Sequence, residues 1–351
     1  MAISAQMVKQ VARECGFDLA GIAPAAPLTE HAWYREWTSR GMAGEMSYLT
    51  DGRGDLRSDP RRLLPSARSV LSVGKFYDGF KPTIGPDDPL ESAQISCYAQ
   101  GRDYHRIVHD CLLDVVRRLQ GAVSEPFEWK VCVDTAPLLE RALARRAGLG
   151  WIGKNSCLIH EGSGSWFFLG EILLSLDLDP DTPPPGRCGS CRRCIDACPA
   201  QAIVPTGRSE PAWAIDSRRC ISYLTIELRG PWPEELRGLT GNQVFGCDIC
   251  QTVCPWNRRA PEVTDGAFKS AVPVPLLSQL ASLDEEGFRR TFRATPVLRA
   301  KHNGFQRNVA TAMGNSRSGK FRAALERMAA SRDPAVSEHA RWAIARIGCA
   351  E

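Results

Sequence analysis

The stretch Cys188-Gly-Ser-Cys191-Arg-Arg-Cys194-Ile-Asp-Ala-Cys198-Pro199 decides the fold of the middle of this chain. Its spacing, C-x2-C-x2-C-x3-C-P, is the one that bacterial ferredoxins use to hold a cubane [4Fe-4S] cluster. A second group, Cys247-Asp-Ile-Cys250-Gln-Thr-Val-Cys254-Pro255, repeats the end of the run, and Cys220 stands as its displaced leading cysteine. Short spacings let one loop present three thiolates, while the fourth cysteine of each run ligates the other cluster.

This crossover predicts two interleaved sets of four thiolates, one set for each cluster. The first set is Cys188, Cys191, Cys194 and Cys254, and the second is Cys198, Cys220, Cys247 and Cys250. Structural zinc is the alternative, because zinc also takes four cysteines in C-x2-C pairs. The third cysteine of the first run, the two Cys-Pro endings and the absence of histidine between the first and last ligands favour iron–sulfur. Such clusters pass single electrons, so the spacing predicts a redox protein without naming its reaction.

The composition is that of an ordinary globular protein. The chain has 351 residues, of which 43% are hydrophobic and 24% charged, and this excludes disorder over the whole length. No run of 18 apolar residues occurs; the strongest stretch, Trp166 to Leu176, is interrupted by Glu171. Residues 1–17 show neither a signal peptide nor a twin-arginine pair. We therefore expect a cytoplasmic protein, without membrane contact, whose clustered thiols hold metal rather than disulfides.

Three regions are expected along the chain. Residues 1–180 alternate helical and strand patterns and predict an α/β domain. A proline-rich linker follows, and residues 181–260 form the ferredoxin-like domain with its two [4Fe-4S] clusters. Residues 261–351 read as an all-α region, in which the helices over 321–330 and from Pro334 onward resemble a HEAT-type hairpin.

Four segments of the first region matter for the site. Periodicity predicts a helix over Arg106–Gln120 and strands over Ser69–Phe76, Phe127–Val133 and Trp166–Leu176. The string Asp134-Thr-Ala-Pro137 predicts a helix that runs to Gly148, with Asp134 as a capping residue. Two glycine-rich strings, 148–153 and 314–320, lack the strand that a nucleotide-binding loop requires before it.

The charge of the chain is uneven. The net charge is only +4, but from Gly287 to Arg332 eleven Lys or Arg residues face one acidic residue, Glu326. Such a segment suits a polyanion such as RNA. A solvated helical surface is the alternative interpretation.

Five longer strings extend the interpretation beyond spacing. They are residues 98–105 (YAQGRDYH), 133–142 (VDTAPLLERA), 147–155 (AGLGWIGKN), 164–171 (GSWFFLGE) and 245–251 (FGCDICQ). Together with the split cysteine motif they closely resemble the epoxyqueuosine reductase family, over nearly the whole chain from about Gly16.

The resemblance implies a reaction, cofactors and partners. It implies reduction of epoxyqueuosine to queuosine at the wobble position of the tRNA anticodon, the last step of queuosine biosynthesis. It implies a cobalamin in the N-terminal α/β domain beside the two clusters, an external low-potential electron donor, and the tRNA anticodon stem-loop as partner. No Asp-x-His-x-x-Gly cobalamin motif occurs. The string that comes closest begins at Asp103 and has Val108 where the motif requires glycine. A reductive dehalogenase-like reductase of a small molecule is the alternative, although the basic tail counts against it.

The resemblance also implies roles for single residues. Asp134 would be the catalytic proton donor, and we expect an apolar pocket to raise its pKa. Arg57 and Cys97 would approach the cobalamin, with Lys154, Asn155 and Gly170 in the same pocket. For Arg57 a surface position in a loop is the alternative. Phosphate contacts to RNA would come from basic residues of the tail, namely Arg289, Arg290, Arg293, Lys301, Arg307, Lys320 and Arg322.

Overall fold

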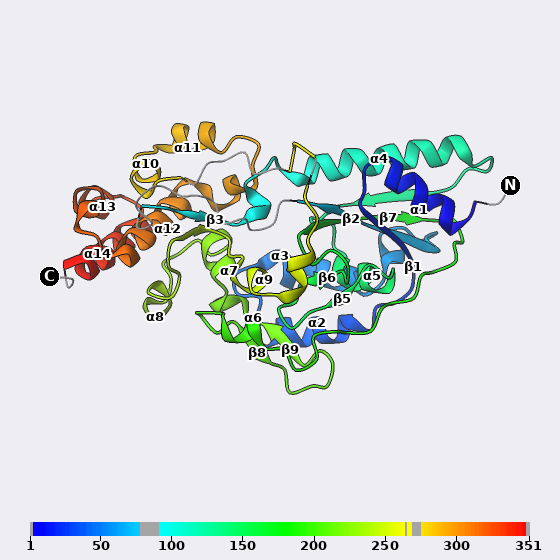
Figure 1. Ribbon diagram of the computed structural model, residues 1–351, viewed down its shortest axis with the longest axis horizontal. Helices are drawn as coiled ribbons and strands as arrows, with labels where there is room; N and C mark the ends of the chain where they lie inside the picture. The colour runs from blue at the N-terminus through cyan, green and yellow to red at the C-terminus, as the bar shows by residue number, and fades with distance from the viewer. Residues whose placement is uncertain (1–2, 78–90, 264, 269–274, 349–351) are drawn as a thin grey trace.

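A computed structural model of the chain describes residues 3–77, 91–263, 265–268 and 275–348. The molecule is elongated, with a sheet and its helices at the N-terminal end and a group of helices at the C-terminal end (Figure 1). The cysteine-rich segment lies between these two ends. None of the described helices is long and apolar enough to cross a bilayer.

A four-stranded antiparallel sheet organises the N-terminal end. Its strands, in spatial order, are β1 (Leu19–Pro24), β2 (Ser69–Phe76), β7 (Phe167–Leu174) and β4 (Trp129–Cys132). Helices α1 (Ala5–Glu14) and α4 (Tyr104–Ala122) pack on one face, and α5 (Glu140–Arg146) packs on the other. Because both faces are covered, the central strands are buried on both sides. The mixed α/β architecture and the three predicted strands are confirmed, with shorter ends for β4.

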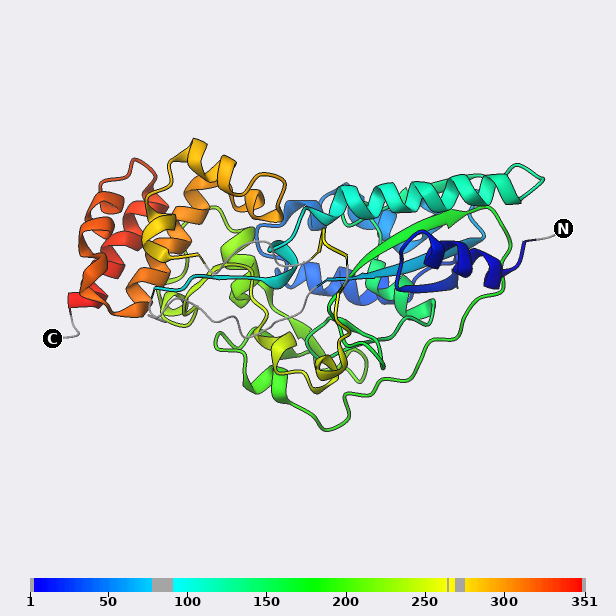
Figure 2. The same ribbon diagram turned by 45° about the horizontal axis from the view of Figure 1, so that its top comes forward.

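Shorter elements complete this end of the molecule. They are α2 (Glu30–Ser39), α3 (Ser47–Thr50), η1 (Gly52–Ser58), η2 (Pro60–Arg62), β3 (Gln94–Ile95), η3 (Cys97–Ala99), β5 (Trp151–Ile152) and β6 (Leu158–Ile159). The segment after β7 then runs along the outer edge of the sheet before it reaches the cysteines (Figures 1 and 2). Asp181 anchors this linker, because its carboxylate pairs with Lys9 Nζ at 2.6 Å and accepts the Ile22 amide at 2.8 Å.

The helix predicted to open at Pro137 begins later in the structure. α5 starts at Glu140, and the capping position is Leu139, which makes no side-chain cap. Asp134 instead has a left-handed backbone, with φ at +50°, a conformation that is rare outside glycine. The interpretation of Asp134 as a helix cap is therefore wrong, because residues 134–139 form a turn whose first side chain is engaged elsewhere.

The cysteine-rich segment consists of short elements between long loops. They are α6 (Arg193–Asp196), β8 (Ile203–Pro205), β9 (Trp213–Ile215), η4 (Ser217–Arg219), α7 (Ile221–Ile226), α8 (Glu234–Arg237), β10 (Gln243–Phe245), α9 (Ile249–Thr252) and η5 (Pro255–Arg259). Among them, β8 and β9 form an antiparallel pair.

The C-terminal end is helical, as predicted. It contains α10 (Leu277–Ala281), α11 (Glu285–Thr291), η6 (Pro296–Ala300), α12 (Lys301–Ser316), η7 (Gly319–Phe321), α13 (Arg322–Ala329) and α14 (Pro334–Gly348). α12 is the central helix of this group and is buried from Gly304 to Gly314. α13 and α14 form the expected hairpin and pack together, with α14 against α12.

The three expected regions share their cores. β3 pairs in parallel with β10, and Ala93, Ile95 and Ala99 lie in the hydrophobic core of the C-terminal helices. Val263 and Phe268 pack back against the N-terminal sheet. Boundaries at residues 180 and 260 therefore mark changes of composition rather than separate folding units.

Arg307 corrects the expected RNA surface. Its side chain is fully buried in α12 and donates to the carbonyl oxygens of Leu224, Leu228 and Gly230 at 2.7 Å each. An arginine enclosed in this way cannot reach a phosphate, so its predicted RNA contact is wrong. The other six basic residues of the tail that were predicted to touch RNA are exposed, and they are Arg289, Arg290, Arg293, Lys301, Lys320 and Arg322.

We predict that Arg307→Met lowers the free energy of unfolding by about 3 kcal/mol, because several buried carbonyl groups lose their donor. Urea unfolding followed by circular dichroism measures the loss. The matched control is Arg322→Met on the exposed face of α13, which should leave stability nearly unchanged. Equal stability of the two variants would contradict the structural role of Arg307.

Candidate functional site: two thiol sets and an aspartate–histidine pair

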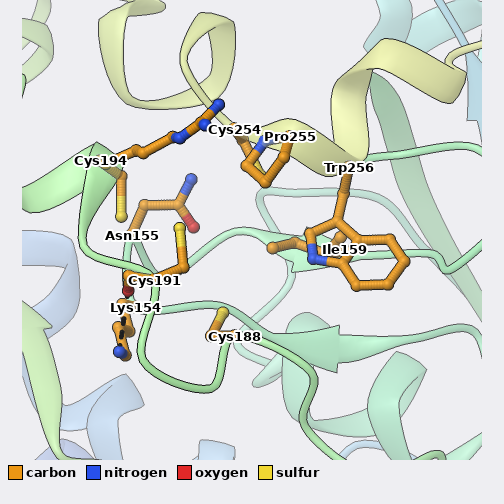
Figure 3. A pocket seen from close by; sticks show the side chains of 10 residues that line it. Lys154, Asn155, Ile159, Cys188, Cys191, Cys194, Cys254, Pro255 and Trp256 are labelled. Atoms are coloured by element: carbon orange, nitrogen blue, oxygen red, sulfur yellow. Dashed lines mark hydrogen bonds between the residues drawn. The ribbon is translucent and has the colours of Figure 1, made fainter.

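The first thiol set surrounds one cavity. Cys188, Cys191, Cys194 and Cys254 all line it, and the space among its lining residues, part of it open to solvent, is about 340 Å³ (Figure 3). Cys254 comes from the second cysteine run and reaches the cavity beside Trp256, opposite the loop that carries the other three. The structure thus brings together the set that the crossover rule predicted.

The second thiol set is gathered on α7, α9 and the loops before them. Burial, with a smaller contribution from the neighbouring Cys250 and Cys198, raises the pKa of Cys220 to about 11. Burial likewise raises the pKa of Cys247, with Cys220 and Cys250 adding to the rise. These mutual effects show that the four thiols lie close together. Thiols crowded in this way become stable thiolates only when a cationic centre compensates their charge.

The donor sets fit iron–sulfur clusters better than single metal ions. Among the described residues, no three His, Cys, Asp or Glu side chains converge closely enough for one ion. The sulfurs instead stand around a space, as a cubane with one thiolate on each of its four irons requires.

Lys154 and Asn155 connect the cysteine runs to the N-terminal end. Lys154 Nζ donates to the carbonyl oxygens of Gly189 at 2.7 Å and Cys191 at 2.9 Å. Asn155 Nδ2 donates to the carbonyl of Cys250 at 3.4 Å, and both side chains line the cavity of the first set (Figure 3). These contacts place the two residues at the clusters, whereas the resemblance implied a cobalamin pocket.

Arg57 is internal rather than a surface arginine in a loop. It is 6% exposed, donates to the carbonyls of Arg53 and Tyr48 at 3.1 and 3.3 Å, and lies over the Tyr34 ring at 5.7 Å. The surface alternative is therefore wrong, and the guanidinium holds the loop between α2 and η1 in shape.

Gly170 lies in the centre of the sheet, under α4. A Cβ at this position would come within 2.9 Å of Val108 and 3.0 Å of Leu112. Close packing of α4 on β7 therefore accounts for this glycine.

Cys97 is tied to the second thiol set through its backbone. The Cys97 amide donates to Asp248 Oδ2 at 2.6 Å, and Ser96 Oγ donates to the other carboxylate oxygen at 2.5 Å. Asp248 directly follows the ligand Cys247, so any movement of one segment is transmitted to the other.

Asp134 forms the end of a hydrogen-bonded chain on the first turn of α4. His105 Nδ1 lies 2.7 Å from Asp103 Oδ1, and His105 Nε2 lies 3.0 Å from Asp134 Oδ2. Asp103 also caps α4 by accepting the His105 amide. Tyr104 stacks between His105 and Phe168, with ring centroids 4.2 Å apart on each side. The imidazole is thus held by two carboxylates and an aromatic stack.

The charges of the hydrogen-bonded residues Asp103, His105 and Asp134 differ from the expected ones. Hydrogen bonds from Asp103 and Asp134 raise the pKa of His105 to about 9, against the effect of burial. Burial raises the pKa of Asp134, but the hydrogen bond and charge of His105, with the charge of Arg299, outweigh it and leave the pKa below its ordinary value. The prediction of a raised Asp134 pKa is wrong for this state, because the mobile proton rests on His105.

Two buried glutamates stand behind Asp134. The Asp134 amide donates to Glu140 Oε1 at 2.5 Å, which holds the turn in its left-handed conformation. Glu171 is fully buried in β7, and its carboxyl group interacts with that of Glu140. Burial and the charge of Asp134 raise the pKa of Glu140 to about 7, and burial and Glu140 raise that of Glu171.

An open cleft of about 970 Å³ lies within range of the charge of Asp134, although neither Asp134 nor His105 lines it. It lies where the three regions meet, and its lining includes Met46, Tyr48, Glu227 and Arg299. Arg299 holds Glu227 with two hydrogen bonds of 2.6 and 3.1 Å, and its charge lowers the pKa of Asp134. A ligand in this cleft would therefore meet the charge field of Asp134.

Sequence reasoning missed His105, Glu140 and Glu171 as members of the site. His105 was considered only as part of an incomplete cobalamin motif, although it ends one of the strings that carry the resemblance. The sequence pattern could have indicated Glu171. A single carboxylate inside an otherwise apolar strand is costly to bury, which points to a functional role.

Comparison with known proteins identifies similar chains over almost the full length. Residues 187–257 match the family described as "4Fe-4S double cluster binding domain", and residues 57–135 match "Epoxyqueuosine reductase QueG, DUF1730". The epoxyqueuosine reductase of Xanthomonas campestris is 43% identical, over 98% of this chain and 96% of that protein.

Two solved structures are also similar. One, of epoxyqueuosine reductase with an epoxyqueuosine-modified tRNA-Tyr stem loop, has 27% identity and a TM-score of 0.86, and covers 98% of this chain and 90% of that one. The other, from Bacillus subtilis with an aspartate-bearing catalytic loop swung out of the active site, has 26% identity and a TM-score of 0.85, and covers 97% and 90%.

We predict that the pKa of His105, about 9 in the intact chain, falls toward 6.5 when either carboxylate loses its charge. Asp103→Asn should lower it more than Asp134→Asn, and asparagine still caps α4. Histidine NMR titration measures both shifts, with the distant His160 as a signal that should not move. A His105 that titrates near 6.5 in the unmodified protein would contradict this network.

We predict that the free energy of unfolding falls as pH rises from about 4.5, because the folded chain keeps protons on Glu140 and Glu171 that the unfolded chain releases. Glu171→Gln should remove on the order of 2 kcal/mol of this fall, measured by urea unfolding at about pH 5 and about pH 8. Glu125→Gln, at an exposed position, is the control. An unchanged pH profile in Glu171→Gln would exclude the shared protons.

Proposed function

The chain belongs to the epoxyqueuosine reductase family, and on that premise we propose that the group around Asp134 reduces epoxyqueuosine to queuosine in a tRNA anticodon loop. The protein is an oxidoreductase with a double [4Fe-4S] cluster domain. The observation that carries the proposal is the Asp103–His105–Asp134 chain, a proton store placed in the same molecule as two thiol sets.

The reaction needs electrons and protons in pairs. Converting an epoxide to an alkene breaks both carbon–oxygen bonds, takes up two electrons and two protons, and releases the oxygen as water. Clusters held by the two thiol sets supply the electrons one at a time. A bound cobalamin, as the resemblance implies, would supply two-electron chemistry that clusters passing single electrons lack.

We propose a location for that cofactor. The cleft lined by Tyr48 and Arg299 is mainly polar and charged, and Tyr48, Met46 and Leu298 form its smaller apolar part. Cys97 is joined through Asp248 to the second thiol set. These features support a cobalamin between Cys97 and the cleft, with the second thiol set as the nearer one.

The residues of the chain handle the protons. His105 holds a proton at neutral pH, and its Nε2 lies 3.0 Å from Asp134 Oδ2. A substrate that covers Asp134 excludes water and raises its pKa, so the proton moves from His105 to Asp134 and onward to the departing oxygen. Asp103 stabilises His105 in its charged form, and Glu140 holds the Asp134 turn in place.

The exposed basic residues of the helical end supply the RNA surface in this proposal. Arg289 and Arg290 on α11, Lys301 at the start of α12, and Arg322 on α13 can contact phosphates and orient the stem-loop. The similar structure that contains a tRNA stem loop supports this assignment, and a tRNA substrate implies a cytoplasmic location. A small-molecule dehalogenase-like activity would leave these residues without a role.

We predict that Asp134→Asn loses about 100-fold or more in turnover while it retains both clusters and cobalamin. The protein is reconstituted anaerobically with iron, sulfide and cobalamin, given a strong reductant and tRNA from cells that lack this activity, and assayed by nucleoside mass spectrometry. Asp110→Asn, at an exposed position on α4, is the matched control.

Two outcomes separate the parts of this proposal. Persistent epoxyqueuosine with the loaded, unmodified protein would exclude the proposed function. Full turnover by Asp134→Asn would leave the function standing but remove Asp134 as the acid.

A further inference from the structure

Three ligands of the first thiol set, Cys188, Cys191 and Cys194, lie on a loop with exposed residues between them. These exposed residues include Gly189, Ser190 and Arg192. The ligands of the second set are flanked by buried residues such as Ile221 and Asp248, which are 3% and 9% exposed. Asp248 also ties the second set to Cys97, on the side of the proposed cobalamin. Electrons from outside would therefore enter at the first set and leave from the second.

The surface around the first set is strongly basic. Residues 187–196 and 254–260, with Lys154 and Glu161, carry six cationic and two anionic side chains. We call the six cations the cluster-side basic face, and they are Lys154, Arg187, Arg192, Arg193, Arg258 and Arg259.

Contacts place four of these residues on one face, namely Lys154, Arg187, Arg193 and Arg259. Arg193 and Lys154 line the cavity of the first set together with Trp256. Arg259 lies over the Trp256 ring at 5.1 Å. Arg259 and Arg187 both bind Glu161, the first at its carbonyl and the second at its carboxylate, at 3.4 and 3.2 Å.

We propose that the cluster-side basic face is the docking surface of an acidic one-electron carrier protein. This rests on the proposed function, which requires an external donor. In each encounter the reduced carrier loses one electron and the first cluster gains it, so two encounters serve one epoxide and no atom is transferred. Opposite charges speed such encounters and orient the two proteins.

An acidic protein fits this face better than RNA does. The basic residues assigned to RNA lie on α11 to α13, at the C-terminal end, whereas α6 and α9 carry the cysteines in the middle of the molecule (Figure 1). The cleft lined by Tyr48 has its own cations, Arg229, Arg299 and Lys301. The cluster-side basic face surrounds the first thiol set, where we propose that electrons enter. The anticodon loop must instead reach Asp134.

Electron uptake by the holoenzyme tests the proposal. A reduced recombinant flavodoxin serves as the acidic carrier, and bleaching of the cluster absorbance is followed anaerobically by stopped flow, without tRNA. The variant Arg187→Glu/Arg259→Glu, at two exposed positions, should take up electrons about tenfold or more slowly at low ionic strength, and the difference should shrink as salt is added. A small uncharged reductant should reduce both proteins at equal rates.

A matched control reverses two charges elsewhere. Arg117 and Arg118 are exposed on α4, and each lies in an ion pair, with Asp114 and Glu14. Arg117→Glu/Arg118→Glu should reduce as fast as the unmodified protein.

Each other outcome has a distinct meaning. Equal flavodoxin rates in all proteins would overturn the docking surface. Unchanged electron uptake with lost binding of a tRNA stem-loop would show that the face binds RNA, and the proposal would be wrong. Slower uptake in the variant, combined with no epoxide reduction even under the small reductant, would support the docking surface and reject the proposed function.

Discussion

The crossing of cysteines between two distant runs is the constraint on which the rest of the structure depends. Cys254 belongs to the second cysteine run, but it lines the cavity formed by Cys188, Cys191 and Cys194 of the first. Residues 199–253 are therefore closed into a loop whose two ends meet at the same site. The C-terminal helices depend on this loop, because Arg307 of α12 is held by carbonyl groups of α7 and the segment after it.

The same segment carries the thiol sets toward the N-terminal end. Asp248 binds the amide of Cys97, and Lys154 and Asn155 bind carbonyl groups of both cysteine runs. Asp134 lies in a turn that Glu140 holds by accepting the Asp134 amide. The side chain of Asp134 is hydrogen-bonded to His105. The cysteine segment is thus joined to Cys97, Lys154 and Asn155 of the N-terminal end through hydrogen bonds to backbone groups.

Prediction from the sequence succeeded where a local pattern has one physical solution. The ligand spacing, the apolar strands and the amphipathic α4 depend on short-range geometry, and the structure has all three. It failed for Asp134 as a helix cap and for Arg307 as an RNA contact. Both residues look ordinary in sequence, and their surroundings come from elements that lie far away along the chain.

The sequence by itself determined the two thiol sets, the α/β and helical regions, and the family resemblance that singled out Asp134, because cysteine spacing and periodicity are local properties. Only the tertiary structure decided where the protons rest. His105 is charged because Asp103 and Asp134 flank it, and Glu171 keeps a proton because the sheet buries it beside Glu140. A pKa depends on the charges and burial that the folded chain assembles around a group, and these are absent from the order of its residues.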